Sequence, residues 1–142
     1  MTEQDFTKRL TVVVRKDLEG WQAANTLAHI SAYIGNKLGD NFGTGDVFET
    51  KDGKTYPRNT QYPIIIKAAN SDEQLHTLLE AVRNTGLVFH GFIREMIETT
   101  GDDEIEQSVL LRNDRNVELL GLGVFGDHER VNLLTKKFAL WK

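Results

Sequence analysis

The sequence predicts a single α/β domain, because apolar strand-like segments alternate with segments of helical periodicity. Residues 10–14, LTVVV, are apolar at every position but one and rich in β-branched side chains, as strands buried at the centre of an α/β sheet are. Residues 62–69, YPIIIKAA, and residues 117–126, VELLGLGVFG, have the same character. A chain of 142 residues can bury one core of its own, so we predict one domain over residues 1–142.

Three longer helices are expected between these strands. Residues 21–38 carry apolar or small side chains every three or four positions, which is the spacing of a helix packed along one side. These positions are Ala24, Leu27, Ala28, Ser31, Ile34 and Leu38. In residues 70–86, Ser71 and Gln74 form a capping box and Gly86 ends the helix. In residues 127–138, Asp127 is the expected N-cap.

The remaining segments complete the pattern. Residues 86–93 and 138–141 are expected as strands, and the strand-helix-strand unit over 62–93 implies a right-handed parallel crossover. The acidic segment 98–114 favours a short helix. Residues 40–62 are rich in Gly and turn pairs, so we expect an irregular and mobile excursion with a small hairpin inside it.

The composition of the chain excludes or disfavours several classes of functional site and partner. The absence of Cys excludes disulfides, thiolate catalysis and cysteine-type zinc sites, and indicates a reducing cytoplasm. No segment approaches the roughly 20 apolar residues that span a bilayer, so no membrane partner is expected. A net charge of −4 disfavours a general nucleic-acid binder, although the basic residues of segments 8–16 and 136–142 leave a local basic patch open. The four histidines lie on separate elements without ligand spacing, so neither a metal nor another cofactor is expected.

Several motifs, taken in order, resemble a known fold family. The segment VVVRKDL is followed by a helix containing ANTLAHISAY, the middle of the chain reads IIIKAANSDEQLHTLLEAVRNTGL, and the end reads LLGLGVFGDHERVNLLTKKFALW. This order is similar to type II peptidyl-tRNA hydrolases. A closer likeness is to the Domain of Unknown Function 2000 family, whose first helix also starts with a Trp-Gln-x-x-Asn pattern. The resemblance implies a mixed, roughly four-stranded sheet flanked by helices, and a homodimer as a frequent assembly.

The resemblance also bears on activity. The hydrolases place a lysine that acts on the ester at the start of the first helix, and the matching position here is Gln22, which supplies no cation. The family's Asp-x-x-x-Thr motif corresponds, with one residue of adjustment, to Glu95 and Thr99. A family threonine at the start of the Gly-x-Gly strand falls on Glu118. Peptidyl-tRNA cleavage would therefore need a different cation, for which Arg15, Lys16 or Arg94 are candidates.

The candidate site itself is a polar row on the first helix. Gln22, Asn25 and His29 are three and four residues apart, so their side chains should share one side of the helix near its N-terminus. Two amides, one titratable imidazole and free helix N–H groups suit a carboxylate, phosphate or acyl group. Trp21 and Arg15 would border such a ligand. The alternative is that His29 is a hydrogen-bonded structural histidine, the amides face solvent, and Trp21 belongs to the core.

Glu95 is the candidate general base, since a partly desolvated carboxylate has a pKa closer to neutral pH. Thr99 or Thr100 could then orient a water molecule. The alternative places Glu95 in the solvated acidic segment that follows it. Three functions thus stay open: a cytoplasmic protein that binds a small acyl, amide or anionic ligand and hydrolyses it with Glu95, Thr99 and His29; a divergent peptidyl-tRNA hydrolase; and a non-catalytic dimeric interaction module.

Overall fold

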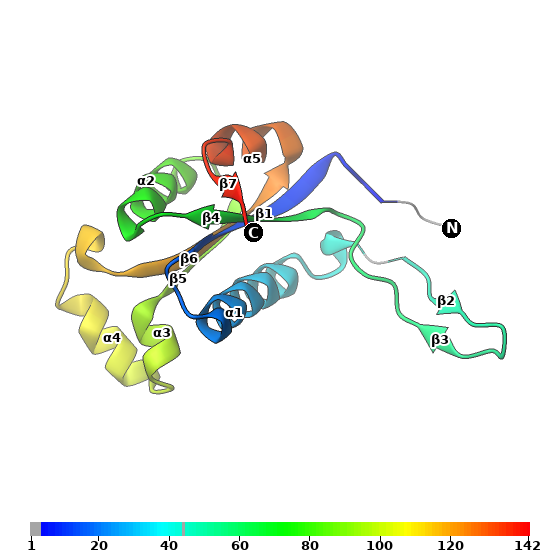
Figure 1. The fold of residues 1–142 in the computed structure, drawn as a ribbon, viewed down its shortest axis with the longest axis horizontal. Helices are drawn as coiled ribbons and strands as arrows, with labels where there is room; N and C mark the ends of the chain where they lie inside the picture. Colours follow the sequence, from blue (N-terminus) through cyan, green and yellow to red (C-terminus); the bar gives the residue numbers. More distant parts are fainter. Residues whose placement is uncertain (1–3, 44) are drawn as a thin grey trace.

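A mixed five-stranded sheet forms the centre of the computed structural model, which describes residues 4–43 and 45–142. The sheet order is β5-β6-β1-β4-β7 (Figure 1). The strands are β1 (Lys8–Arg15), β4 (Ile64–Ala69), β5 (Val88–Ile93), β6 (Leu119–Asp127) and β7 (Ala139–Leu140). β1 is parallel to β4, whereas β6 is antiparallel to both β1 and β5. The α/β class and the mixed sheet are thereby confirmed.

Two sheet features differ from expectation. The resemblance implied about four strands, but the final strand predicted over residues 138–141 is present as β7 and adds a fifth, pairing antiparallel with β4, where Leu140 lies opposite Lys67. The expected strand-helix-strand unit is present, and β4 and β5 run in the same direction. They are not neighbours, because β1 and β6 lie between them, so the connection through α2 (Asp72–Arg83) passes over two strands.

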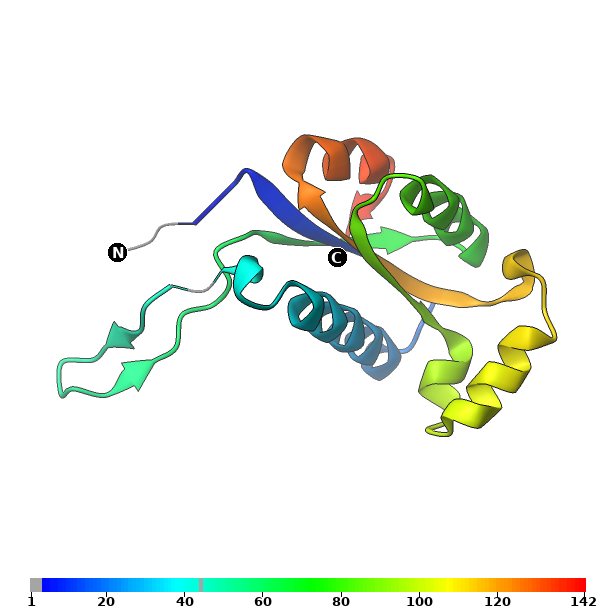
Figure 2. The same cartoon turned by 180° about the vertical axis from the view of Figure 1, so that it is seen from behind.

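Helices cover both faces of the sheet (Figures 1 and 2). α1 (Gly20–Leu38) packs on one face, whereas α2 and α5 (His128–Thr135) pack on the other. The expected short helix is α4 (Asp102–Leu110), and it follows α3 (Arg94–Glu98), which the sequence did not indicate. Two 3₁₀ turns, Gly39–Phe42 and Asp114–Asn116, complete the helical elements. No helix of the described residues is long and apolar enough to cross a bilayer.

The predicted caps are confirmed at two helices. The backbone N–H of Gln74 donates to Ser71 Oγ at 3.3 Å, and the Gln74 side chain accepts from the N–H of Asn70 at 2.8 Å. Asp127 Oδ2 accepts from the backbone N–H groups of Glu129 and Arg130, both at 3.1 Å. These bonds satisfy donors that would otherwise lack a partner, so each helix begins where its local sequence dictates.

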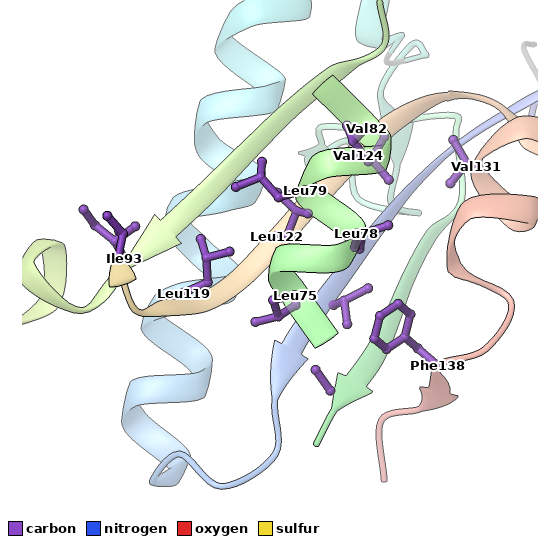
Figure 3. Close-up of a cluster of buried hydrophobic side chains, with 13 residues drawn as sticks. Leu75, Leu78, Leu79, Val82, Ile93, Leu119, Leu122, Val124, Val131 and Phe138 are labelled. Atoms are coloured by element: carbon purple, nitrogen blue, oxygen red, sulfur yellow. The ribbon is translucent and has the colours of Figure 1, made fainter. Parts of the chain in front are cut away.

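Under α2 and α5 lies a cluster of buried side chains (Figure 3). Leucines of α2 lie against leucine and valine side chains of β6, and Phe138 closes the cluster beside β7. The second cluster, under α1, contains Leu10, Val12 and Val14 of β1. Because successive residues of β1 serve opposite faces, both clusters depend on the apolar run predicted for a central strand.

The buried side of α1 differs from the predicted stripe. Its buried residues are Ala23, Thr26, Ile30 and Ile34, so only Ile34 of the predicted set is fully buried. The reason lies in β6. A Cβ atom at Gly123 would overlap the Cγ2 methyl of Ile30, and one at Gly121 would lie 2.7 Å from Thr26 Cγ2. The two glycines thus give Thr26 and Ile30 room against the sheet, which fixes the rotation of α1.

The predicted hairpin forms a separate two-stranded ribbon. β2 (Phe48–Glu49) and β3 (Thr55–Tyr56) pair antiparallel, and Gly53 adopts a φ of 85° in the connecting turn. The ribbon extends away from the sheet and helices (Figures 1 and 2). Residue 44 of the predicted excursion lies outside the described residues.

Candidate functional site

Trp21, Asn25, His29 and Tyr33 lie at intervals of four residues along α1 and line one side of a groove. We call this groove the α1–α3 groove. It consists of two adjoining hollows of about 470 and 600 Å³, which share His29, Met96, Thr99 and Thr100. The first hollow is also lined by Trp21, Asn25, Ile97 and Glu98, and the second by Ala32, Tyr33, Asn36, His90, Phe92, Asp102 and Ile105.

The two amide side chains of the predicted row, Gln22 and Asn25, have different roles. Gln22 Oε1 accepts a hydrogen bond from the backbone N–H of Glu19 at 3.2 Å, so this amide caps the start of α1. Asn25 is half-buried and lines the groove, and no described residue forms a hydrogen bond with its amide. The structure therefore brings Asn25 and His29 together in the groove, whereas Gln22 is engaged at the helix end.

Two ring stacks form the centre of the groove. His29 stacks on Phe92 with ring centroids 5.2 Å apart, and Tyr33 stacks on His90 at 4.2 Å. Burial lowers the pKa of His90 below its ordinary value of 6.5, and the neighbouring His29 lowers it further. Its ring is therefore neutral at neutral pH.

Trp21 lies at the end of the groove and is not part of the core. The residue is 59% exposed to solvent, and its indole N–H donates to Glu19 Oε2 at 2.9 Å. Tyr33 and Met96 are also exposed large side chains. The groove thus offers solvent-accessible aromatic and thioether surface next to the Asn25 amide, a combination of apolar and polar groups typical of small-molecule sites.

Glu95 points elsewhere. Its carboxylate is buried, Oε2 accepts from Ser108 Oγ at 2.6 Å, and the same oxygen lies 3.6 Å from a guanidinium nitrogen of Arg112. Oε1 has no hydrogen-bond partner among the described residues. These contacts join α3 to α4. Glu95 does not line either hollow, so the structure does not place it beside Asn25 and His29.

Thr99 does line the groove, as does its neighbour Thr100. The Thr99 hydroxyl donates to Glu104 Oε2 at 2.9 Å and accepts from the N–H of Gly101 at 3.1 Å. These bonds order the turn between α3 and α4. Thr99 is therefore near His29 in the groove, with its hydroxyl engaged in the turn.

Arg15 belongs to an ion-pair cluster at the carboxyl ends of β1 and β5. Its guanidinium donates to Asp17 Oδ2 at 2.7 Å and to Glu118 Oε2 at 2.6 Å, and Arg94 donates to the same Glu118 oxygen at 2.7 Å. The hydrogen bond from Arg94, reinforced by the one from Arg15, lowers the pKa of Glu118. Arg15 is thus neutralised within the protein and is not directed at the groove.

Comparison with known proteins adds a family. The family described as protein of unknown function (DUF2000) matches residues 8–142. The chain belongs to the DUF2000 family. A solved structure of Atu0240, a protein of unknown function from Agrobacterium tumefaciens strain C58, matches this DUF2000 chain with a TM-score of 0.83 and 22% identity, over 97% of this chain and 100% of the other. That likeness shows a shared fold. No curated protein matches the chain.

The sequence did not indicate several groove residues of this DUF2000 protein. Tyr33 continues the four-residue spacing of Asn25 and His29, so the helical pattern contained a signal for it. His90 and Phe92 alternate along β5 on the face that α1 covers, but strand order was needed to bring them to α1. No group of three His, Cys, Asp or Glu among the described residues could hold a metal ion.

Proposed function

We propose that this protein binds a small molecule in the α1–α3 groove, with an acyl, amide or anionic group of the ligand beside Asn25 and His29. The observation that supports it most is that a row of α1 residues, spaced four positions apart, lines a groove that contains two ring stacks. The exposed rings of Trp21 and Tyr33 offer faces for an apolar or flat ligand body. The Asn25 amide supplies both a donor and an acceptor.

A hydrolytic step in this groove would use His29 as its base. His29 is solvent-exposed and lines both hollows, and histidine is the side chain that most often serves as a general base. Thr99 and Thr100 would lie on the opposite wall, where a hydroxyl can orient a water molecule. Glu95 would contribute indirectly, because its bond to Ser108 holds α4, whose first residues border the groove.

The proposal is tested by a thermal-shift screen with small carboxylates, amides and phosphate esters. Ligands that raise the melting temperature of the wild type should bind Asn25→Ala and His29→Ala at least about tenfold more weakly, which corresponds to about 1.4 kcal/mol. Asn132→Ala and His128→Ala are matched controls, because both residues lie on α5 across the sheet. Equal ligand shifts in all five proteins would refute the groove as the binding site.

A parallel assay with peptidyl-tRNA separates this proposal from the divergent hydrolase. Gln22 caps α1, and Arg15 and Arg94 are bound to Glu118. Lys16, the third candidate cation, has no ion-pair partner among the described residues, but it lines neither hollow of the α1–α3 groove. We expect the peptide to stay attached to tRNA at low salt. Release of the peptide by wild type but not by His29→Ala would refute the small-molecule proposal and support the divergent peptidyl-tRNA hydrolase.

A further inference from the structure

Another hollow lies at the carboxyl ends of β1 and β4, beside the start of α2 and the segment around β7. Its volume is about 370 Å³, and we call it the lysine hollow. It is lined by Lys16, Ala68, Asn70, Gln74, Lys137, Phe138, Ala139, Leu140, Trp141 and Lys142. Lys16 directly follows β1 and Asn70 directly follows β4, where Ala68 also lines the hollow. Gln74 of α2 and residues 137–142 around β7 form the remaining wall.

The chain topology opens a crevice at this place. β1 and β4 are adjacent and parallel, but β1 leads into α1 on one face of the sheet and β4 leads into α2 on the opposite face (Figure 1). Two connections that diverge in this way leave space between the strand ends. In open α/β sheets, ligands bind at such points of divergence.

The charges of the lysine hollow are unbalanced. Among residues 4–43 and 45–142, no carboxylate forms an ion pair with Lys16, Lys137 or Lys142. The charge of the whole chain is −4, and Arg15, Arg83, Arg94, Arg112 and Arg115 all have carboxylate partners. Lys16 and Lys137, without such partners at one concave surface, create a local positive potential that attracts an anion.

An apolar hollow of about 260 Å³ adjoins the lysine hollow, and Trp141 lines both. It lies between α1 and the sheet, where Val14 and Ile66 contribute from the strands and Ala23 and Leu27 from the helix. The backbone N–H of Trp141 donates to the carbonyl of Ile66 at 3.0 Å, which fixes the tryptophan at the boundary. A positive hollow and an apolar hollow thus meet at Trp141.

We propose that these two hollows bind an amphipathic anion, with a carboxylate or phosphate group among the lysines and an alkyl or similar apolar group beyond Trp141. The ammonium groups of Lys16 and Lys137 pair with the anionic head. The Asn70 amide and the side-chain NH2 group of Gln74, whose oxygen already accepts from the N–H of Asn70, complete its hydrogen bonds. The apolar hollow removes the tail from water. This site does not share a lining residue with the α1–α3 groove, so it stands independently of the function proposed there.

Trp141 provides the readout. The chain has two tryptophans, so Trp21→Phe leaves Trp141 as the only indole, and its fluorescence can be titrated with decanoate, decyl phosphate, inorganic phosphate and the neutral decanamide. We expect a saturable spectral change with the first two probes and about tenfold weaker binding of decanamide. Inorganic phosphate should displace decanoate at high concentration, because both compete for the lysines.

Charge-removing variants in the same background complete the test. Lys16→Gln combined with Lys137→Gln should weaken decanoate binding about tenfold and leave decanamide binding unchanged. Lys51→Gln combined with Lys54→Gln, on the exposed hairpin turn, removes the same net charge and should change neither constant. Equal binding of decanoate and decanamide, or an equal loss in both double variants, would overturn the proposal. The absence of any saturable change would overturn it as well.

Discussion

At the scale of single residues, Gly121 and Gly123 determine which side of α1 faces the groove. Because neither glycine has a side chain, Thr26 and Ile30 can pack directly against β6. Asn25 and His29 immediately precede these two residues, and each step along a helix turns the side chain by about 100°. The two groove residues are therefore directed sideways, toward α3, as a consequence of two missing methyl groups in a neighbouring strand.

We expect Gly123→Ala to lower the free energy of unfolding by about 1–3 kcal/mol, because its Cβ would overlap Ile30 and meet Ile34 Cδ1 at 3.0 Å. Urea denaturation measures the change. Gly20→Ala is the control, since a Cβ there meets no atom within 4 Å, and it should change stability by less than about 0.5 kcal/mol. Ile30→Ala should cost less in the Gly123→Ala background than in the wild type. Independent, additive costs would contradict this packing.

At the scale of elements, α3 and α4 form the wall of the groove that faces α1. They follow β5 directly, and the hydrogen bond between the buried Glu95 and the half-buried Ser108 joins them. A carboxylate with little solvent access depends on such a partner, because an unpaired buried charge is costly. Glu95 is thus a positioning residue for the wall that carries Thr99 and Thr100.

Ser108→Ala should loosen α4 without affecting the sheet. The lost bond involves a charged acceptor, so the local cost should be about 1.5–3 kcal/mol. Hydrogen exchange followed by mass spectrometry should show faster exchange in Asp102–Leu110 and unchanged protection in Leu119–Asp127. Gln107→Ala, an exposed neighbour, should leave both regions as in the wild type. Unchanged exchange of α4 in Ser108→Ala would show that Glu95 does not hold this helix.

The elements with local signals could be predicted from the sequence. Ser71 and Asp127 cap their helices through bonds that span only two or three residues, so their prediction needed no tertiary information. The buried side of α1 could not be read in this way, because it depends on glycines about a hundred residues later. α3 was also missed, since five residues are too few to show a helical period.

The candidate site was predictable to the same extent. Asn25 and His29 share one side of α1 because helical spacing alone brings them together. Gln22 belongs to the same spacing, but a competing bond to the N–H of Glu19 engages it. The direction of the Glu95 carboxylate depends on where α4 packs. Its partner Ser108 is 13 residues away, in a helix that the sequence indicated only weakly. Local periodicity therefore predicted the row, and tertiary packing selected which members of it line the groove.

At the scale of the whole molecule, both proposed sites lie around α1 at the same end of the sheet. The lysine hollow is at the carboxyl ends of β1 and β4, and the α1–α3 groove adjoins the carboxyl end of β5. Between them, Arg15 and Arg94 are both bound to Glu118. The positive charge of these arginines is compensated inside the protein, whereas that of the lysines remains available to a ligand.

The stability of the whole protein should depend on pH through His90. Burial, and then His29, lower its pKa in the folded state, so the unfolded chain takes up a proton at a higher pH, near the ordinary value of 6.5. The stabilisation is therefore complete above pH 6.5 and decreases as the pH falls toward the lowered folded-state value. The titratable groups lining this hollow with it are His29 and Tyr33 of α1 and Asp102 of α4.

His90→Phe keeps a ring beside Tyr33 and removes the titration. Urea denaturation of both proteins at pH 8, 6 and 5 should show that the wild type loses more stability on acidification than the variant does. Asp102→Asn in each background tests whether the nearby carboxylate offsets the charge on His90. If it does, Asp102→Asn should increase the loss of stability on acidification only in the protein that retains His90. A stability difference between wild type and His90→Phe that stays constant from pH 8 to pH 5 would show that His90 keeps the same pKa in the folded and unfolded chains.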